Sequence, residues 1–262
     1  MALDEDQLAR TLQRDYVNFY PRNTRCTFVP LAARGPWIVT LHGAVLHDSA
    51  GYGMLGMGHN VPALLQSLSE PRVMANVMTP SFSQLRFAER LRREIGHTRG
   101  GCPFARFICM NSGSEAVSVA SRISDINTLE QTGTGGPHAG KRIKRLTLEG
   151  SFHGRTYRAA RVSDSTRAVY RQHLASFQGA DDLLTVAPND CQALEDAFAR
   201  ADADGVFLEA FYVEPVMGEG VPGLAITREF YDRARELTRE RGAMLIMDSI
   251  QAALRAQGCL SI

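Results

Sequence analysis

Residues 206–220 read Val-Phe-Leu-Glu-Ala-Phe-Tyr-Val-Glu-Pro-Val-Met-Gly-Glu-Gly. The apolar run at 206–213 predicts a buried strand, and the Pro and Gly residues that follow it predict a loop. Helical patterns flank this unit at 191–200 and 227–241, and another apolar run follows at 243–247. Strands that alternate with helices in this way predict an α/β fold, with a mainly parallel sheet and flanking helices on both faces.

The same alternation extends toward the N-terminus as far as about residue 84. Further strands are predicted at 106–110, 145–148 and 183–186, and further helices at 84–96 and 114–129. The first part of the chain differs, with an amphipathic helix predicted at 5–17, a hairpin at 37–47 and a glycine-rich stretch at 51–62. We therefore expect residues 1–58 to form a small N-terminal segment and residues 59–262 to form a large domain.

The composition excludes several classes of protein. The net charge is only +1, which argues against a partner such as nucleic acid or a membrane surface. The five cysteines are scattered and form no CxxC pair, so we expect neither disulfides nor a metal site, and a reducing cytoplasm as the location. No apolar run approaches the ~20 residues of a membrane helix. Only two of the 29 basic residues are lysines, Lys141 and Lys144.

Parallel sheets bind ligands at the carboxyl ends of their strands, so motifs at those positions are candidate sites. The first is Asn-Ser-Gly-Ser-Glu-Ala at 111–116, between a predicted strand and a predicted helix. A helix N-terminus binds phosphate through free N–H groups; Gly113 would allow close approach, and Ser114 could add a hydroxyl. The alternative is an ordinary serine N-cap.

The second motif is Ser-Phe-His-Gly-Arg-Thr at 151–156, also directly after a predicted strand. Phe152 could stack on a planar ligand, and Arg155 could bind a carboxylate with its forked guanidinium group. The alternative is a buried phenylalanine, a histidine with ordinary hydrogen bonds and a surface arginine.

Two further motifs follow the strands predicted at 206–213 and 243–247. In the first, Glu214 and Glu219 lie in the loop at 214–220, where a polar turn is the alternative. In the second, Asp248 ends a buried strand, where an unpaired carboxylate is costly. Such an aspartate can hold a heteroaromatic nitrogen protonated, as pyridoxal phosphate requires. The alternative is a helix N-cap.

The four motifs, in this order, resemble the class-III pyridoxal-phosphate-dependent aminotransferases, a family that includes acetylornithine, ornithine and 4-aminobutyrate aminotransferases. The resemblance runs from about residue 35 to the last residue. It implies the fold of type-I pyridoxal-phosphate-dependent transferases, with residues 59–262 as a cofactor-binding domain that is incomplete at its C-terminus. It also implies roles for residues at matching positions. Gly113, Ser114, Phe152, His153, Asp248 and Gln251 would bind the cofactor, and Arg155, Glu214 and Glu219 would bind substrates.

Within these roles, Gly113 and Ser114 would bind the cofactor phosphate and Phe152 would stack on its pyridine ring. Asp248 would contact the pyridine nitrogen and is the residue expected to act in catalysis. Gln251 would contact the phenolic oxygen, and His153 would shape the wall beside the ring. The sequence departs from the family at Ser249, where a glutamate is usual.

A second departure is that the family's Schiff-base lysine lies farther along the chain than the aspartate matching Asp248. This sequence ends shortly after Asp248, and neither Lys141 nor Lys144 fits, since both precede the second motif. We expect both lysine side chains to be solvated. We therefore expect the chain to be a fragment of a longer polypeptide and to be inactive by itself.

The resemblance implies transfer of an amino group from an amine or amino acid to an oxo-acid, with 2-oxoglutarate as the expected acceptor. Two alternatives stay open: a mutase or racemase with the same fold and cofactor, and a truncated non-catalytic paralogue that acts as a binding module. The family also implies a homodimer, with 51–62 and 74–82 contributing at the interface. The sequence does not distinguish the amino donor.

Overall fold

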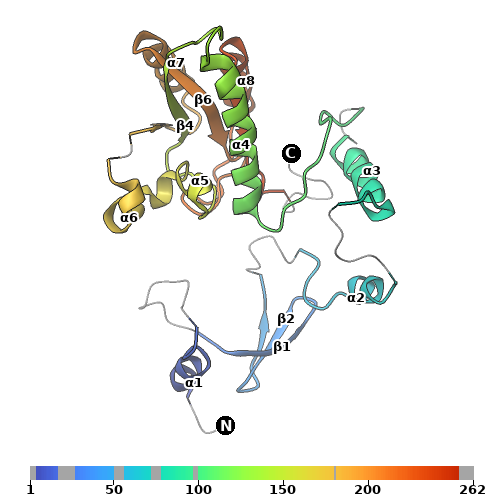
Figure 1. Cartoon of the computed structure of the whole chain (residues 1–262). Coiled ribbons are helices and arrows are strands. Elements are labelled where there is room, and N and C mark those ends of the chain that lie inside the picture. The colour runs from blue at the N-terminus through green and yellow to red at the C-terminus, as the bar shows by residue number, and fades with distance from the viewer. Residues whose placement is uncertain are drawn as a thin grey trace. The chain divides into compact units, whose positions relative to one another are not determined.

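The computed structural model describes residues 4–16, 27–49, 56–71, 78–96, 100–179 and 181–253. The chain divides into two compact units, Met1–Pro80 and Ser81–Ile262 (Figure 1). The boundary predicted after residue 58 stays a prediction.

The N-terminal unit contains a short helix, a three-stranded antiparallel sheet and a second helix. Helix α1 (Glu5–Leu12) begins with a capping box between Asp4 and Gln7. The sheet has the order β1-β2-β3, formed by β1 (Pro30–Arg34), β2 (Trp37–Thr40) and β3 (Val45–His47). The predicted hairpin is confirmed, because β2 and β3 pair antiparallel. The predicted helix at 5–17 ends earlier, at Leu12, and neither β1 nor α2 (Pro62–Leu68) was predicted.

The larger unit is built on a four-stranded parallel sheet of order β5-β4-β6-β7. Its strands are β4 (Arg142–Leu148), β5 (Leu183–Val186), β6 (Val206–Val213) and β7 (Met244–Met247). Its helices are α3 (Phe82–Gly96), α4 (Gly113–Thr132), α5 (Tyr157–Ala160), α6 (Asp164–His173), α7 (Cys191–Ala203) and α8 (Arg228–Glu240), with a 3-10 turn at Ala175–Phe177. The α/β class and the parallel sheet are thus confirmed.

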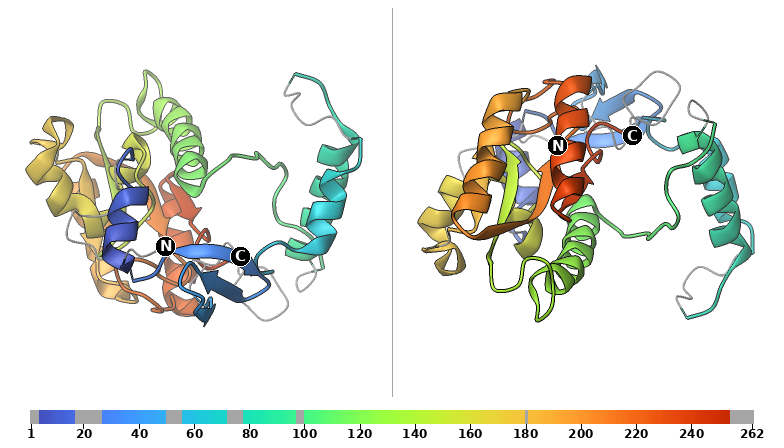
Figure 2. Two further views of the ribbon diagram at one scale, coloured as in Figure 1. Left: turned by 90° about the horizontal axis from the view of Figure 1, so that it is seen from below. Right: turned by 90° about the horizontal axis from the view of Figure 1, so that it is seen from above.

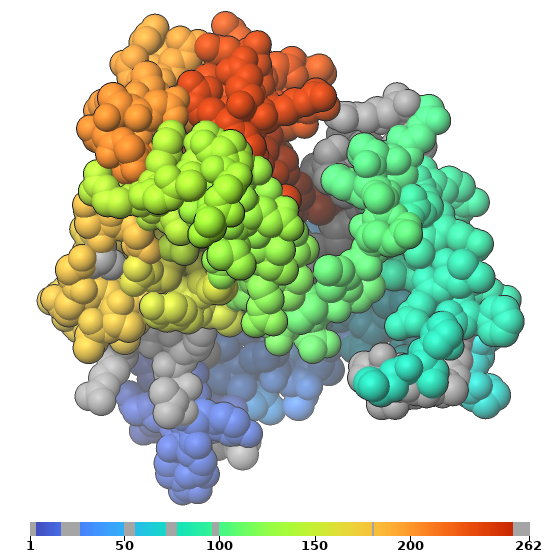
Figure 3. Space-filling view, turned by 45° about the horizontal axis from the view of Figure 1, so that its top comes forward, coloured from blue at the N-terminus to red at the C-terminus, as the bar shows by residue number. Residues whose placement is uncertain are grey.

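The sheet has a hydrophobic core on each face. Helices α7 and α8 pack on one face, where Phe198 and Phe230 are almost completely buried. Helices α4 and α5 pack on the other face through Val117 and Ala159 (Figure 2). Helix α4 also forms much of the surface turned toward the viewer in Figure 3, where it is lime green. All eight residues of β6 are buried, because this central strand is covered from both sides.

The predicted strand at Arg106–Met110 is wrong for this structure, which has no regular element there. Ile108 and Met110 are exposed by 63% and 42%. A strand needs the hydrogen bonds of a neighbouring strand, and no strand of the described sheets pairs with this segment. The residues just before this segment are attached to α3, since the Arg92 guanidinium donates to the carbonyl oxygens of Phe104 and Ala105.

Among the described residues, no helix combines the length and the apolar character that crossing a membrane requires.

Candidate active site

Three loops and one helix start meet where the strands of the parallel sheet end. The loops follow β4, β6 and β7, and the helix start is the N-terminus of α4. Because parallel strands point the same way, their carboxyl ends share one edge of the sheet. Hydrogen bonds connect the residues of the four predicted motifs along this edge.

The centre of the site is a buried pair between Asp248 and His153. Asp248 directly follows β7, and His153 lies in the loop after β4. His153 Nδ1 lies 2.8 Å from Asp248 Oδ2, and their side chains are 0% and 4% exposed. The other carboxylate oxygen, Oδ1, accepts a hydrogen bond from the Ile250 N–H at 3.1 Å. The buried carboxylate is therefore paired, which offsets the cost of removing it from water.

Residues that the sequence did not single out hold His153 in place. Its Nε2 lies 3.1 Å from Thr147 Oγ1, and its backbone N–H donates to Ser163 Oγ at 2.8 Å. Thr147 and Ser163 are fully buried. Nothing in the sequence marked Thr147, because threonine is a common strand residue and its burial depends on the neighbouring strands.

Glu214 joins two loops through its side chain. Its Oε1 accepts from the Phe152 N–H and its Oε2 from the Gly218 N–H, both at 2.8 Å. Burial raises the pKa of this carboxyl, and the two backbone N–H donors act in the opposite direction. Because both oxygens are already hydrogen-bonded, Glu214 fixes the loops that carry the site. Its predicted contact with substrate stays a prediction.

Gln251 lies against the backbone of Gly218. A Cβ atom at Gly218 would overlap the Gln251 amide group. Glycine at this position therefore leaves room for the Gln251 side chain beside Glu214. The structure thus brings Gln251 to the same edge of the sheet as Asp248.

Ser114, in the first turn of α4, is attached to the loop after β4. The Arg155 N–H donates to Ser114 Oγ, and Thr156 Oγ1 donates to the Ser114 carbonyl oxygen, both at 3.0 Å. Gly154 has φ +119°, and a Cβ atom there would overlap Ser114. The predicted serine cap is also present, since Ser112 Oγ accepts from the Glu115 N–H at 3.3 Å.

Arg155 lies between an aromatic ring and a carboxylate. Its guanidinium carbon is 5.5 Å from the centroid of the Phe152 ring, and its Nη2 is 3.2 Å from Glu219 Oε1. The side chains of Arg155 and Glu219 are 37% and 39% exposed, so the pair is open to solvent. The structure therefore groups these three predicted residues.

The two lysines lie elsewhere. Lys141 Nζ is 3.6 Å from Asp202, and Lys144 Nζ is 3.0 Å from Asp181. Asp181 precedes β5, so this ion pair belongs to the opposite edge of the sheet from Asp248. Both lysines are paired rather than only solvated. Of the segments implied in a dimer interface, residues 51–55 and 74–77 lie outside the described residues.

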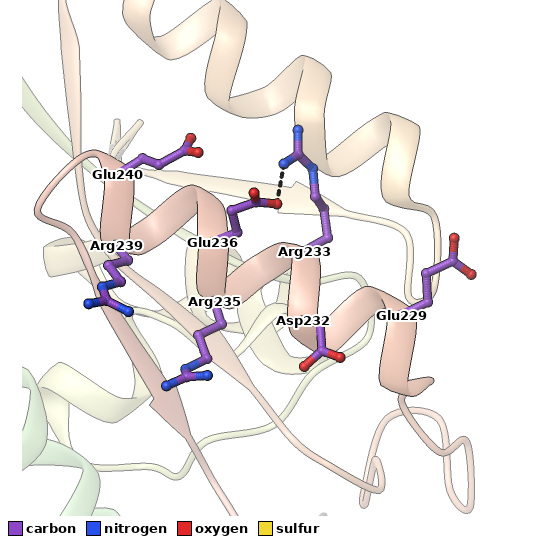
Figure 4. Close-up of a pocket in the computed structure, with 7 residues that line it drawn as sticks. All are labelled: Glu229, Asp232, Arg233, Arg235, Glu236, Arg239 and Glu240. Carbon is purple, nitrogen blue, oxygen red and sulfur yellow. Dashed lines mark hydrogen bonds and ion pairs between the residues drawn. The ribbon is translucent and has the colours of Figure 1, made fainter.

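A surface hollow on the outer face of α8 is lined only by charged residues (Figure 4). Arg233 contacts Glu236 on the same helix and Glu195 on α7. The opposite face of α8 packs on the core through Phe230 and Leu237. The hollow is thus a solvated helix face with internal ion pairs, and we assign no ligand to it.

The sequence profile of class-III aminotransferases matches residues 19–260. The chain belongs to this class-III aminotransferase family. It is 33% identical over 223 residues to the acetylornithine aminotransferase of Xanthomonas campestris pv. campestris, a match covering 81% of this chain and 48% of the relative. Members of the family depend on pyridoxal phosphate.

The chain is also similar to one solved structure and to one further relative. The ornithine aminotransferase of Toxoplasma gondii superposes with a TM-score of 0.69 at 23% identity, over 97% of this chain and 55% of that one. The glutamate-1-semialdehyde 2,1-aminomutase of Rhodopirellula baltica is 25% identical over 85% of this chain and 47% of that protein. The fold of type-I pyridoxal-phosphate enzymes is therefore confirmed. The chain spans about half the length of these relatives.

Proposed function

We propose that this chain supplies most of the cofactor site and part of the substrate site of a pyridoxal-phosphate-dependent aminotransferase. The enzyme would pass an amino group from an amine or amino acid to an oxo-acid, with 2-oxoglutarate as the expected acceptor. The observation that carries the proposal is the buried carboxylate of Asp248. It is fixed by His153 at the edge of the sheet where Ser114, Phe152 and Arg155 also lie.

The residues present fit this cofactor. The N-terminus of α4 offers N–H groups to a phosphate. The glycines at 113 and 154 allow close packing around it, because an added Cβ atom would overlap Ile250 and Ser114, respectively. Phe152 supplies a ring face, and Asp248 supplies a carboxylate to a protonated pyridine nitrogen. When bound, pyridoxal phosphate supplies an electron sink that depends on this protonated nitrogen.

Each of the following site residues then has a defined task. Gly113 and Ser114 bind the phosphate, Phe152 and His153 form the walls beside the ring, and Gln251 orients the phenolic oxygen. Asp248 holds the proton at the ring nitrogen. Arg155 binds a substrate carboxylate, and Glu219 holds that arginine while no acidic substrate is bound.

Binding of pyridoxamine 5'-phosphate tests the cofactor site, because this ligand needs no lysine. We expect the protein to bind it and Asp248→Ala to weaken binding roughly tenfold to a hundredfold, which corresponds to a charged hydrogen bond of about 1.5–3 kcal/mol. Asp196→Ala, on the exposed side of α7, is the matched control. Equal affinity of the wild type and Asp248→Ala would contradict the assignment.

A mutase is the second candidate, and the similarity to a glutamate-1-semialdehyde 2,1-aminomutase favours it over a racemase. A mutase and an aminotransferase use the same cofactor contacts. Product analysis of the full-length protein with an amino donor and 2-oxoglutarate separates them. An isomerised substrate without amino transfer would replace the aminotransferase assignment.

A non-catalytic binding module is the third candidate. Sequencing the coding region past residue 262 distinguishes it from an enzyme. An open frame that reaches a lysine after a further strand supports the enzyme, and a stop codon directly after residue 262 supports the binding module.

A homodimer and a cytoplasmic location complete the proposal. Class-III aminotransferases are typically dimers with small-molecule substrates, and we infer the same here. Equilibrium sedimentation of the full-length protein tests the homodimer. An enzyme that stays active as a monomer at high dilution would contradict the homodimer.

A further inference from the structure

The residues that directly precede α5 and α6 do not use their hydroxyl groups to cap these helices (Figure 1). A short polar residue before a helix ordinarily accepts a hydrogen bond from an N–H group in the first turn of that helix. Side-chain bonds of this kind are present at the starts of α1, α4, α7 and α8. Thr156 precedes α5 and Ser163 precedes α6, and within the described residues neither side chain forms such a bond.

The hydroxyl of Ser163 contacts the loop after β4 instead. Its Oγ accepts from the His153 N–H at 2.8 Å, and this hydrogen bond has only one direction, because a backbone N–H cannot accept. The Ser163 proton has two carbonyl oxygens within reach, that of Ala159 at 3.0 Å and that of Gly154 at 3.2 Å. Ser163 and His153 are 0% and 2% exposed. Removing the hydroxyl would therefore leave a buried N–H group without this acceptor.

The hydroxyl of Thr156 contacts the start of α4. Its Oγ1 lies 3.0 Å from the Ser114 carbonyl oxygen and 2.8 Å from Ser118 Oγ, and Ser118 Oγ lies 2.8 Å from the same carbonyl oxygen. Every distribution of the two hydroxyl protons over these contacts connects Thr156 to α4. The neighbouring Arg155 adds a second contact, because its N–H donates to Ser114 Oγ at 3.0 Å.

The two hydroxyls thus hold one loop at two points. Ser163 fixes the backbone of His153, whose ring contacts Asp248. Thr156 fixes the end of the loop that carries Arg155 to the first turn of α4. Between these two points, the spacing of the loop from Asp248 on one side and from α4 on the other is set.

We propose that Ser163 and Thr156 are positioning residues that hold the loop at 152–155 in its binding conformation. Neither hydroxyl has to touch the cofactor or a substrate for this role. A loop that is ordered before the ligand arrives lowers the entropic cost of binding. This inference rests on the proposed function, in which the loop forms one wall of the cofactor site.

A role in helix stability alone does not account for these contacts. A hydroxyl that served only its own helix would accept an N–H group of the first turn, as Thr227 does at the start of α8. Helix α5 has only four residues and α6 has no buried residue, so both would gain from a cap. Their preceding hydroxyls are nevertheless directed at the loop and at α4.

Hydrogen exchange and ligand binding test the two hydroxyls on the 262-residue protein. In Ser163→Ala, exchange of the His153 N–H should become about fivefold faster, the equivalent of one net hydrogen bond. The Kd of pyridoxamine 5'-phosphate should rise about fivefold in Ser163→Ala and about threefold in Thr156→Val, because the ligand then has to order the loop. Thr156→Ser keeps the hydroxyl and should bind the ligand like the wild type.

Thr227→Val is the matched control, because Thr227 Oγ1 accepts from the Phe230 N–H of its own helix at 3.2 Å. It should lower the melting temperature and leave the Kd unchanged. Thr156→Val should show the reverse, a higher Kd with a smaller change in melting temperature. An equal rise in Kd in Thr227→Val and Thr156→Val would reflect a general loss of stability and would overturn the inference. A wild-type Kd in Thr156→Val would overturn it as well.

Two further outcomes keep this inference separate from the proposed function. If Ser163→Ala fails to fold, Thr156→Val and Thr156→Ser decide the matter, since Thr156 is exposed and tolerates substitution. A wild type without affinity for pyridoxamine 5'-phosphate would contradict the proposed function. In that case the His153 N–H still tests the loop: faster exchange in Ser163→Ala supports the positioning role of Ser163, and unchanged exchange rules it out.

Discussion

The guanidinium group of Arg155 contacts the carboxylate of Glu219, with 3.2 Å between Nη2 and Oε1. The two residues come from different loops, after β4 and after β6, and more than a third of each side chain is exposed. An exposed pair of this kind contributes little to stability. The pair instead holds Arg155 above the Phe152 ring. In the proposed function, an incoming substrate carboxylate would take the place of Glu219 there.

Replacing Arg155 should therefore affect acidic substrates most. In the full-length protein, we expect Arg155→Ala to raise KM for 2-oxoglutarate roughly tenfold to a hundredfold, because a charged hydrogen bond of about 1.5–3 kcal/mol is lost. Steady-state kinetics measure this, with Arg228→Ala on the exposed surface of α8 as the control. An unchanged KM for the oxo-acid would exclude the role of Arg155.

Glu214 should make stability depend on pH. Burial raises its pKa above the ordinary value of a glutamate, so the folded chain holds this proton more tightly than the unfolded chain does. The corresponding stabilisation is complete below the unfolded pKa and is lost as pH rises through the folded pKa. Glu214→Gln removes this pH-dependent contribution to the free energy of unfolding.

Urea unfolding at several pH values, compared between the wild type and Glu214→Gln, measures the difference. Glu209 is also buried with a raised pKa, and it remains in both proteins, so its contribution cancels. If the free energies of unfolding of the two proteins changed with pH in parallel, Glu214 would not titrate as expected.

Gly154 combines a backbone conformation that favours glycine with close contact to Ser114. It has φ +119°, and a Cβ atom there would overlap the Ser114 side chain. Gly205 has φ +63° with nothing within 4 Å of an added Cβ, which makes it a matched control. Gly205→Ala should cost about 1–2 kcal/mol of unfolding free energy.

Gly154→Ala should cost more than Gly205→Ala, because the overlap adds to the backbone strain. It should also weaken binding of inorganic phosphate, since the Arg155 N–H that contacts Ser114 Oγ follows this glycine. Thermal unfolding and phosphate titration measure both effects. Equal unfolding free energies for the two variants would mean that Ser114 moves away without cost.

The sequence predicted those parts of the fold that depend on local apolar runs. The strands at Leu183–Val186 and Val206–Val213 have the predicted bounds, because turn residues border each run. Three of the predicted motifs meet because the parallel strands β4, β6 and β7 end at one edge, and the N-terminus of α4 brings the first motif to them. In contrast, the strand predicted at Arg106–Met110 is absent, because no strand of the described sheets pairs with this segment, and a local apolar pattern does not report on such pairing.

The sequence also did not predict α6 or the buried polar contacts of His153. Helix α6, Asp164–His173, is mostly polar and has no buried residue, so it lacks the apolar stripe that predicts a helix. Thr147 resembles any strand threonine until β6 and the loop after β4 enclose it. The partners of His153 were therefore visible only in three dimensions.

Treatment with pyridoxal phosphate and borohydride tests whether either lysine of this chain acts as the Schiff-base residue. Lys144 pairs with Asp181 at 3.0 Å and Lys141 with Asp202 at 3.6 Å, and Asp181 and Asp202 precede β5 and β6. These ion pairs hold both ammonium groups at the amino ends of the strands, whereas Asp248 follows β7. In the proposed site, a lysine that bonds to the cofactor would have to reach the carboxyl ends of the strands. Peptide mapping of the reduced 262-residue protein should therefore show no lysine with a stoichiometric label. Both lysines should be labelled weakly, and to the same extent with and without inorganic phosphate. Specific, phosphate-sensitive labelling of Lys141 or Lys144 would place a lysine in the site and would require a different position for the cofactor.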